Sequence, residues 1–113
     1  MKAALLLAAL LLASLTGCSG DDAGDGPVTI DVSISGGKTE PSGKTVKVAK
    51  GADITLKITS DIDDEIHVHS TPDHSFPVTA GQASEEKFSF DAPGTYEMES
   101  HKLDKLIVKF EVR

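Results

Sequence analysis

The sequence predicts an all-β domain, an antiparallel sandwich or barrel, over residues 28–113. Two observations predict it: apolar and polar residues alternate with a period of two in several short segments, and turn-forming residues separate these segments. No segment repeats apolar residues with the 3.6-residue period of an amphipathic helix, so helix is expected to be nearly absent. Short alternating strands with regular turns are typical of sandwiches and barrels.

The first strand is expected at residues 28–34, where four β-branched apolar residues alternate with polar ones, and Gly36-Gly37 predicts the turn that follows it. Later turns are expected at residues 50–53 and 91–94, and a proline-bearing loop is expected before Phe88. The remaining strands are expected around six apolar sets: Val46/Val48, Ile54/Leu56/Ile58, Ile66/Val68, Phe88/Phe90, Tyr96/Met98 and Leu106/Val108/Phe110/Val112.

The N-terminus predicts export. After Lys2, residues 3–15 form an Ala/Leu run that is interrupted only by Ser14. This run is shorter than the roughly 20 apolar residues that a membrane span needs. Residues 1–17 are therefore interpreted as a signal peptide. The segment Leu15-Thr16-Gly17-Cys18 resembles the bacterial lipobox. This resemblance implies cleavage before Cys18 and a lipid anchor on that cysteine, at the extracytoplasmic face of the cell membrane, or on the outer membrane if the organism has one.

The composition limits the partners of the exported part. Residues 18–27 are Gly-, Asp- and Ser-rich and are expected to form a flexible, lipidated tether to a single domain at residues 28–113. The net charge of −7 argues against nucleic acid, which requires clustered Lys and Arg. The membrane is expected to be contacted through the lipid on Cys18.

Two segments of the predicted domain resemble cupredoxins. The first is Asp64-Glu65-Ile66-His67-Val68-His69, which resembles the strand carrying the upstream histidine ligand. The second, Ala92-Pro93-Gly94-Thr95-Tyr96-Glu97-Met98-Glu99-Ser100-His101, is similar to the Pro-Gly-x-Tyr-x-x-x-Cys segment before the copper loop. The resemblance implies an antiparallel Greek-key sandwich, similar to the cupredoxin-like domains of periplasmic iron-uptake lipoproteins.

The sequence departs from that family at the copper ligands. Ser100 occupies the position of the copper cysteine, and the loop at residues 102–105 contains neither His nor Met. A type 1 copper site needs a thiolate beside two imidazoles, and the lone cysteine, Cys18, is expected to be lipidated. Electron transfer by blue copper is therefore not expected.

A different metal site is expected from histidine and carboxylate. Strand alternation places His67 and His69 on one face, and Glu99 and His101 on one face of a later strand. Convergence of the two strands would give a site of His67, His69 and His101 with Glu99 assisting, for which copper is favoured and zinc or iron are alternatives. The competing interpretation is an exposed polar edge of the sheet that binds no metal.

The expected function is metal handling in the cell envelope, with a metal transporter or another envelope protein as partner. No nucleophile motif or phosphate-binding glycine loop is present, and neighbouring Ser100 and His101 are expected on opposite faces of their strand, so the chain is not expected to be an enzyme. The alternative function is a metal-free β-sandwich that serves as an interaction module of the envelope.

Overall fold

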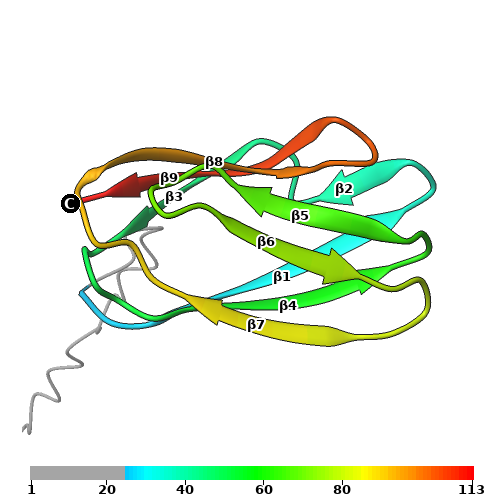
Figure 1. Cartoon of the computed structure of the whole chain (residues 1–113), viewed down its shortest axis with the longest axis horizontal. Coiled ribbons are helices and arrows are strands. Elements are labelled where there is room, and N and C mark those ends of the chain that lie inside the picture. The colour runs from blue at the N-terminus through cyan, green and yellow to red at the C-terminus, as the bar shows by residue number, and fades with distance from the viewer. Residues whose placement is uncertain (1–24) are drawn as a thin grey trace, which may run out of the picture.

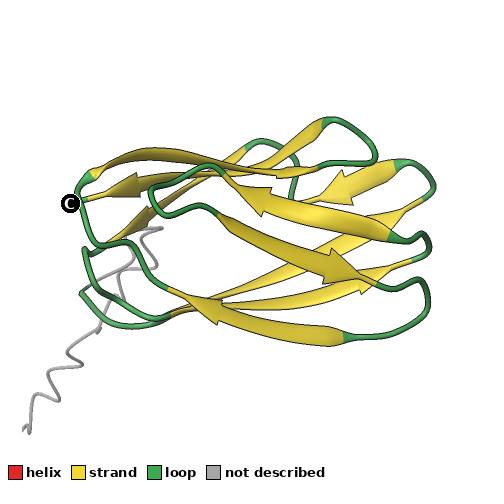
Figure 2. Ribbon diagram, viewed as in Figure 1, coloured by secondary structure: helices red, strands yellow, loops and turns green. Residues whose placement is uncertain are grey.

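The alternating segments form strands in the computed structural model, which describes residues 25–113. The predicted signal peptide, Cys18 and most of the predicted tether lie outside the described residues. Nine strands and no helix are present among the described residues, which confirms the all-β prediction (Figure 2). Residues 25–113 contain no helix that is long and apolar enough to cross a membrane.

The strands form two stacked sheets (Figure 1). The first sheet has the order β2-β1-β4-β7, with β1 at Val28–Ser35, β2 at Lys38–Glu40, β4 at Ile54–Ser60 and β7 at Ser84–Phe88. The second has the order β3-β9-β8-β5-β6, with β3 at Lys44–Val48, β5 at Asp64–Val68, β6 at His74–Val78, β8 at Gly94–Ser100 and β9 at Lys105–Val112. The sandwich is therefore confirmed.

Both sheets are mixed, a feature that the sequence did not predict. β1 pairs in parallel with β4, and β3 pairs in parallel with β9, whereas the other strand pairs are antiparallel. Parallel neighbours must be joined by a long connection, and here the chain crosses to the other sheet between them. Local alternation identifies a strand but carries no information about its partner.

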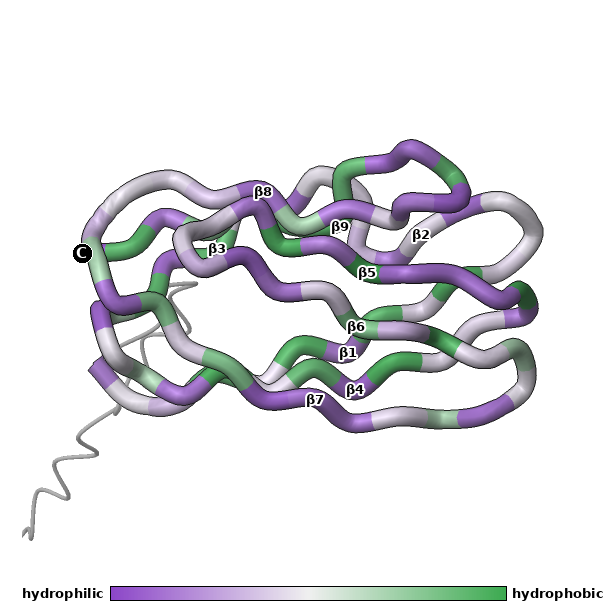
Figure 3. Tube along the Cα trace, viewed as in Figure 1, coloured by the Kyte–Doolittle hydropathy of each residue, from purple (hydrophilic) through white to green (hydrophobic). Residues whose placement is uncertain are grey.

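Alternate residues of each strand fill the space between the sheets. On β4, Ile54, Leu56 and Ile58 are at most 1% exposed, and Figure 3 shows the alternation of hydrophobic and hydrophilic residues along β1 and β4. Burying each such side chain contributes about 1.5–3 kcal/mol. The core cluster of the described residues runs from Ile30 to Val112, so a fragment of residues 25–113 contains the complete core described.

The turns and two further strands complete the fold. Gly36 and Gly37 form the predicted turn with φ values of 60° and 74°, and they join β1 to β2, a strand that the sequence did not predict, in a two-residue hairpin. The expected proline-bearing loop instead contains β6. Its Pro77 is exposed, because β6 is an edge strand and a residue without an N–H is tolerated there.

Candidate functional site

The two histidines of the His-x-His segment lie together on the outer face of the five-stranded sheet. Ile66 and Val68 are fully buried in the core, and the alternation of β5 therefore sends His67 and His69 to the opposite side. Their ring centroids lie 4.1 Å apart, with the rings tilted by 50°. The predicted pairing of these two residues on one face is what the structure shows.

Glu99 reaches this pair from the neighbouring strand. It lies opposite His67 in the register of β5 and β8, and its Oε1 is 2.7 Å from Nε2 of His69. The contact is diagonal across the two strands, a distance within reach of a long side chain. The structure thus brings together three of the four residues predicted as metal ligands.

Asp73 is a fourth member of this cluster that the sequence analysis missed. Its Oδ2 lies 3.0 Å from Nε2 of His67. The hydrogen bond with His67 is the main cause that holds the pKa of the Asp73 carboxyl below its usual value, and the charge of His67 acts in the same direction. The connection between β5 and β6 places Asp73 beside His67, and a carboxylate shortly after a His-x-His strand segment is the only sequence clue to this contact.

His101 lies elsewhere. It follows β8, its backbone N–H donates to the Glu65 carbonyl oxygen at 2.9 Å, and it lines a separate surface hollow with Asp63, Asp64 and Lys102. Figure 1 shows the connection after β5 and the turn after β8 near opposite ends of the sheet. His101 therefore lies beside the start of β5, whereas His69 follows the end of β5.

The cluster is made of pairs and is not a preformed metal centre. Among residues 25–113, no group of three or more His, Cys, Asp or Glu side chains is arranged to hold a metal ion. The donor types nevertheless suit divalent transition metals, since imidazole and carboxylate ligate copper, zinc and iron. A bound ion requires side-chain rearrangement at this exposed surface, where His67 is 25% and His69 is 47% exposed.

Ser100 has a structural role in a different network. It is fully buried, and its Oγ donates to Oδ2 of Asp64 at 2.5 Å and accepts from the N–H of Leu103 at 3.1 Å. The other carboxylate oxygen of Asp64 accepts from the N–H of Lys102 at 2.8 Å. Through these hydrogen bonds, the Asp64 carboxylate and the Ser100 hydroxyl connect the turn between β8 and β9 to the start of β5.

This network does not fit type 1 copper. The one cysteine of the sequence is Cys18, so the described domain contains no thiolate for the centre. The equivalence of Ser100 with the copper cysteine of cupredoxins remains a prediction. What the structure shows is that the hydroxyl of Ser100 is engaged on both its donor and its acceptor side.

His74 is a second residue whose setting the sequence did not indicate. It begins β6 and is half-buried, with its ring centroid 5.1 Å from that of Phe88. It falls within the proline-bearing loop expected before Phe88, but the contact with Phe88 arises only when β6 and β7 meet at the sandwich edge. Its packing makes it a structural aromatic rather than a partner of His67 and His69.

Comparisons of sequence and of structure give different results. No protein-family model matches the chain, and no curated protein matches it in sequence. Solved structures do match. Auracyanin A, a blue copper protein from the green thermophilic photosynthetic bacterium Chloroflexus aurantiacus, is 14% identical, with a TM-score of 0.59 and coverage of 78% of this chain and 100% of its own.

Two further structures agree with it. A purple cupredoxin from Nitrosopumilus maritimus is 12% identical, with a TM-score of 0.53 and coverage of 76% of this chain and 99% of its own. Fet3p, a multicopper oxidase that functions in iron import, is 14% identical with a TM-score of 0.60. The match covers 79% of this chain but only 23% of the length of Fet3p. At these identities the similarity establishes a fold and not a ligand. The described domain therefore has the cupredoxin fold.

Proposed function

We propose that this chain is a lipid-anchored envelope protein whose cupredoxin-fold domain binds a divalent transition metal through His67 and His69, with Glu99 assisting. Copper is the favoured ion, and zinc and iron are the alternatives. The role is metal capture or delivery in the envelope, without catalysis and without nucleic acid. The observation that carries the proposal is the pair of imidazole rings 4.1 Å apart, each in contact with a carboxylate.

The carboxylates favour one tautomer of each ring. An ionised carboxylate only accepts hydrogen bonds, so Nε2 of His67 donates to Asp73 and Nε2 of His69 donates to Glu99. In a neutral ring this leaves Nδ1 as the free lone pair. Carboxylates that hold a histidine in this way are common around metal-binding histidines, where they orient the ring and fix its tautomer. Asp73 and Glu99 accordingly support metal binding through the two rings.

Calorimetric titration of residues 25–113 with Cu(II), Zn(II) and Fe(III) tests the proposal. We expect binding of Cu(II) with a Kd of about 1 μM or tighter, and a loss of at least about tenfold in the His67→Ala/His69→Ala double variant. The matched control is His101→Ala, which removes an exposed imidazole outside the cluster and is expected to leave the affinity unchanged. Absence of binding, or equal affinity in the double variant, contradicts the metal site.

The membrane anchor requires its own test. Mass spectrometry of the protein from its native envelope is expected to show a mature N-terminus at Cys18 that carries a diacylglyceryl group. A Cys18→Ser variant is expected to keep residues 1–17, because the processing depends on the modified cysteine. A wild-type chain cleaved elsewhere, or one without lipid, contradicts the anchor and leaves the metal proposal to be judged separately.

The second candidate function is a metal-free interaction module of the envelope. It is favoured by the absence of a three-ligand group among residues 25–113 and by the engagement of Ser100 with Asp64. In that case chemical cross-linking in the envelope yields the same partner with and without a metal chelator, and the His67→Ala/His69→Ala variant retains it. A partner lost on chelation supports the metal site instead.

A further inference from the structure

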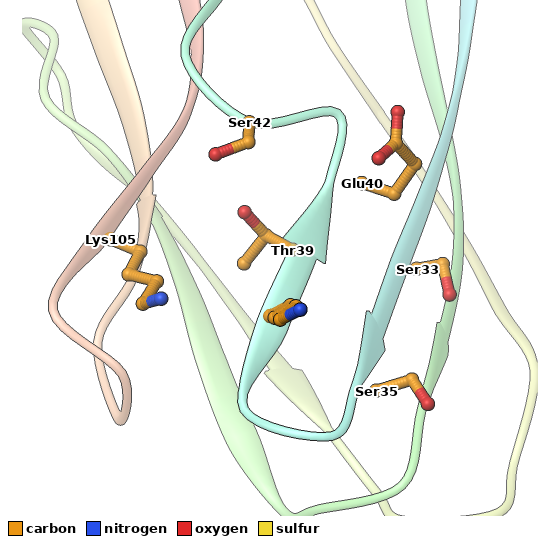
Figure 4. Close-up of a pocket in the computed structure, with 7 residues that line it drawn as sticks. Ser33, Ser35, Thr39, Glu40, Ser42 and Lys105 are labelled. Atoms are coloured by element: carbon orange, nitrogen blue, oxygen red, sulfur yellow. The ribbon is translucent and has the colours of Figure 1, made fainter.

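A polar hollow lies at the end of the sandwich where the β1–β2 hairpin approaches the start of β9. Its volume is about 410 Å³, and it is lined by Ser33, Ser35, Lys38, Thr39, Glu40, Ser42 and Lys105 (Figure 4). Figure 4 shows the side chains of Thr39, Ser42 and Lys105 on one side of β2 and those of Ser33 and Glu40 on the other. The hollow therefore has a hydroxyl-and-ammonium side that is separated by β2 from the Glu40 carboxylate.

The hydroxyl of Thr39 is the unusual feature of this hollow. Thr39 is only 5% exposed, because it lies opposite the buried Ile34 in the β1–β2 register and shares its inward orientation. Its Oγ1 is buried and has no hydrogen-bond partner in the described part of the chain. Burying a hydroxyl without a partner is costly, so such a group in a native structure calls for a specific explanation.

Positive charge is available beside this hydroxyl. Neither Lys38 nor Lys105 forms an ion pair with any of residues 25–113. Lys105 lies on the same side of β2 as the Thr39 side chain (Figure 4), whereas Lys38 is opposite Ser35 in the β1–β2 register and therefore shares the face of Glu40. An ammonium group flanked by hydroxyl donors suits an oxyanion, because each N–H and O–H group donates to the oxygens of the ligand.

We propose that Thr39, Ser42 and Lys105 form a binding site for a phosphate-type oxyanion. The ligand supplies the missing partner of the Thr39 hydroxyl and the counter-charge of Lys105. This site is independent of the histidine cluster on the outer face of the five-stranded sheet.

The position of the hollow favours a soluble ligand over a lipid headgroup. Ser33 and Ser35 lie in the last three residues of β1, and a strand rises about 3.3 Å per residue, so these lining residues are about 17–23 Å along β1 from Val28, where the strand begins. Any tether that leads into Val28 therefore meets the domain at the end remote from the hollow.

Titration of ¹⁵N-labelled residues 25–113 with inorganic phosphate, followed by amide chemical shifts at constant ionic strength, tests the site. We expect saturable shifts confined to residues 33–43 and the start of β9, with a Kd below about 10 mM. Lys105→Gln is expected to weaken binding by at least about tenfold. Lys50→Gln, which removes one exposed charge from the turn between β3 and β4, is the matched control and is expected to leave binding unchanged.

Thr39→Val gives a readout that a merely structural threonine would not give. This variant is expected to lose phosphate binding and to raise the Tm of the phosphate-free protein, because it removes the unpartnered hydroxyl while keeping the side-chain shape. If Thr39→Val fails to fold, phosphate binding is compared between Thr39→Ser and Lys105→Gln instead. Thr39→Ser retains the hydroxyl and is expected to keep binding phosphate.

A second arm of the experiment identifies the source of the oxyanion. Vesicles of phosphatidylcholine with and without phosphatidic acid are offered to wild type and Lys105→Gln. Saturation by free phosphate supports a soluble ligand, whereas binding only to phosphatidic acid, lost in Lys105→Gln, assigns the site to a lipid headgroup. Shifts that do not saturate, or that persist unchanged in Lys105→Gln, overturn the site.

Discussion

Replacement of Ser100 by alanine is expected to destabilise the domain by about 2.5–4 kcal/mol. The variant loses a hydrogen bond from a fully buried hydroxyl to the Asp64 carboxylate, at 2.5 Å. Hydrogen bonds to charged groups contribute about 1.5–3 kcal/mol, and the N–H of Leu103, which now donates to Ser100 Oγ, is left without its partner at an added cost of about 1 kcal/mol. The turn between β8 and β9 is the region expected to loosen.

Urea denaturation of residues 25–113, followed by far-ultraviolet circular dichroism, measures this loss, because the sequence has no tryptophan to report by fluorescence. We expect a lower midpoint with an unchanged m-value, and a fall in Tm of at least about 8 °C. The matched control is Ser75→Ala. Its hydroxyl also donates to a carboxylate, that of Glu65 at 2.8 Å, but both groups are exposed, so the change is expected to stay within about 0.5 kcal/mol.

A double-mutant cycle of Ser100→Ala with Asp64→Ala separates this contact from general loss of packing. The two side chains are bonded directly, so we expect a coupling energy of at least about 1 kcal/mol. Additive effects of the two substitutions, or a loss below about 1 kcal/mol in Ser100→Ala alone, would refute the reasoning that this buried pair fastens the turn.

Three further predictions concern the core, the hairpin and the histidine cluster. Leu56→Ala is expected to cost about 2–5 kcal/mol in chemical denaturation, while Lys57→Ala on the exposed face of the same strand changes stability little. Gly37→Ala, at a φ of 74°, is expected to cost about 1 kcal/mol in the same assay. The folded-state pKa of Asp73 is below its usual 3.8, so its contribution to stability is present above that value and is lost as the pH falls through the folded-state pKa. Carboxyl ¹³C titration by NMR is expected to show this low midpoint and its return toward 3.8 in His67→Ala; an unchanged midpoint contradicts the assignment to His67.

Local alternation was sufficient to predict which side chains enter the core. Ile30, Val32 and Ile34 are buried as the period-two pattern of residues 28–34 requires, because successive side chains of a strand point to opposite faces. The same rule placed His67 and His69 together on the outer face. Gly36-Gly37 predicted a turn, and both glycines adopt a positive φ there, but the short strand β2 that makes this turn a hairpin was not predicted.

The alternation failed where the backbone is irregular. The period-two pattern of residues 106–112 favours Leu106 as a core residue, but Leu106 is only half-buried and Ile107 is fully buried. A register shift between Met98 and Glu99 on β8 leaves Ile107 as the extra residue of β9, so that Ile107 and Val108 both face the core. Such a bulge is set by the pairing of two strands and has no signature in either one alone.

The sequence by itself determined the all-β class, the faces of the main strands and the residue types available for a metal, because each of these depends on neighbours a few positions apart. Only the tertiary structure decided which strands pair, and with them the composition of the cluster. It joined Glu99 to His69, added Asp73 to His67 and placed His101 beside Glu65. These contacts span up to 36 positions in the sequence, and they depend on strand register and on the connections between strands, which local periodicity leaves undetermined.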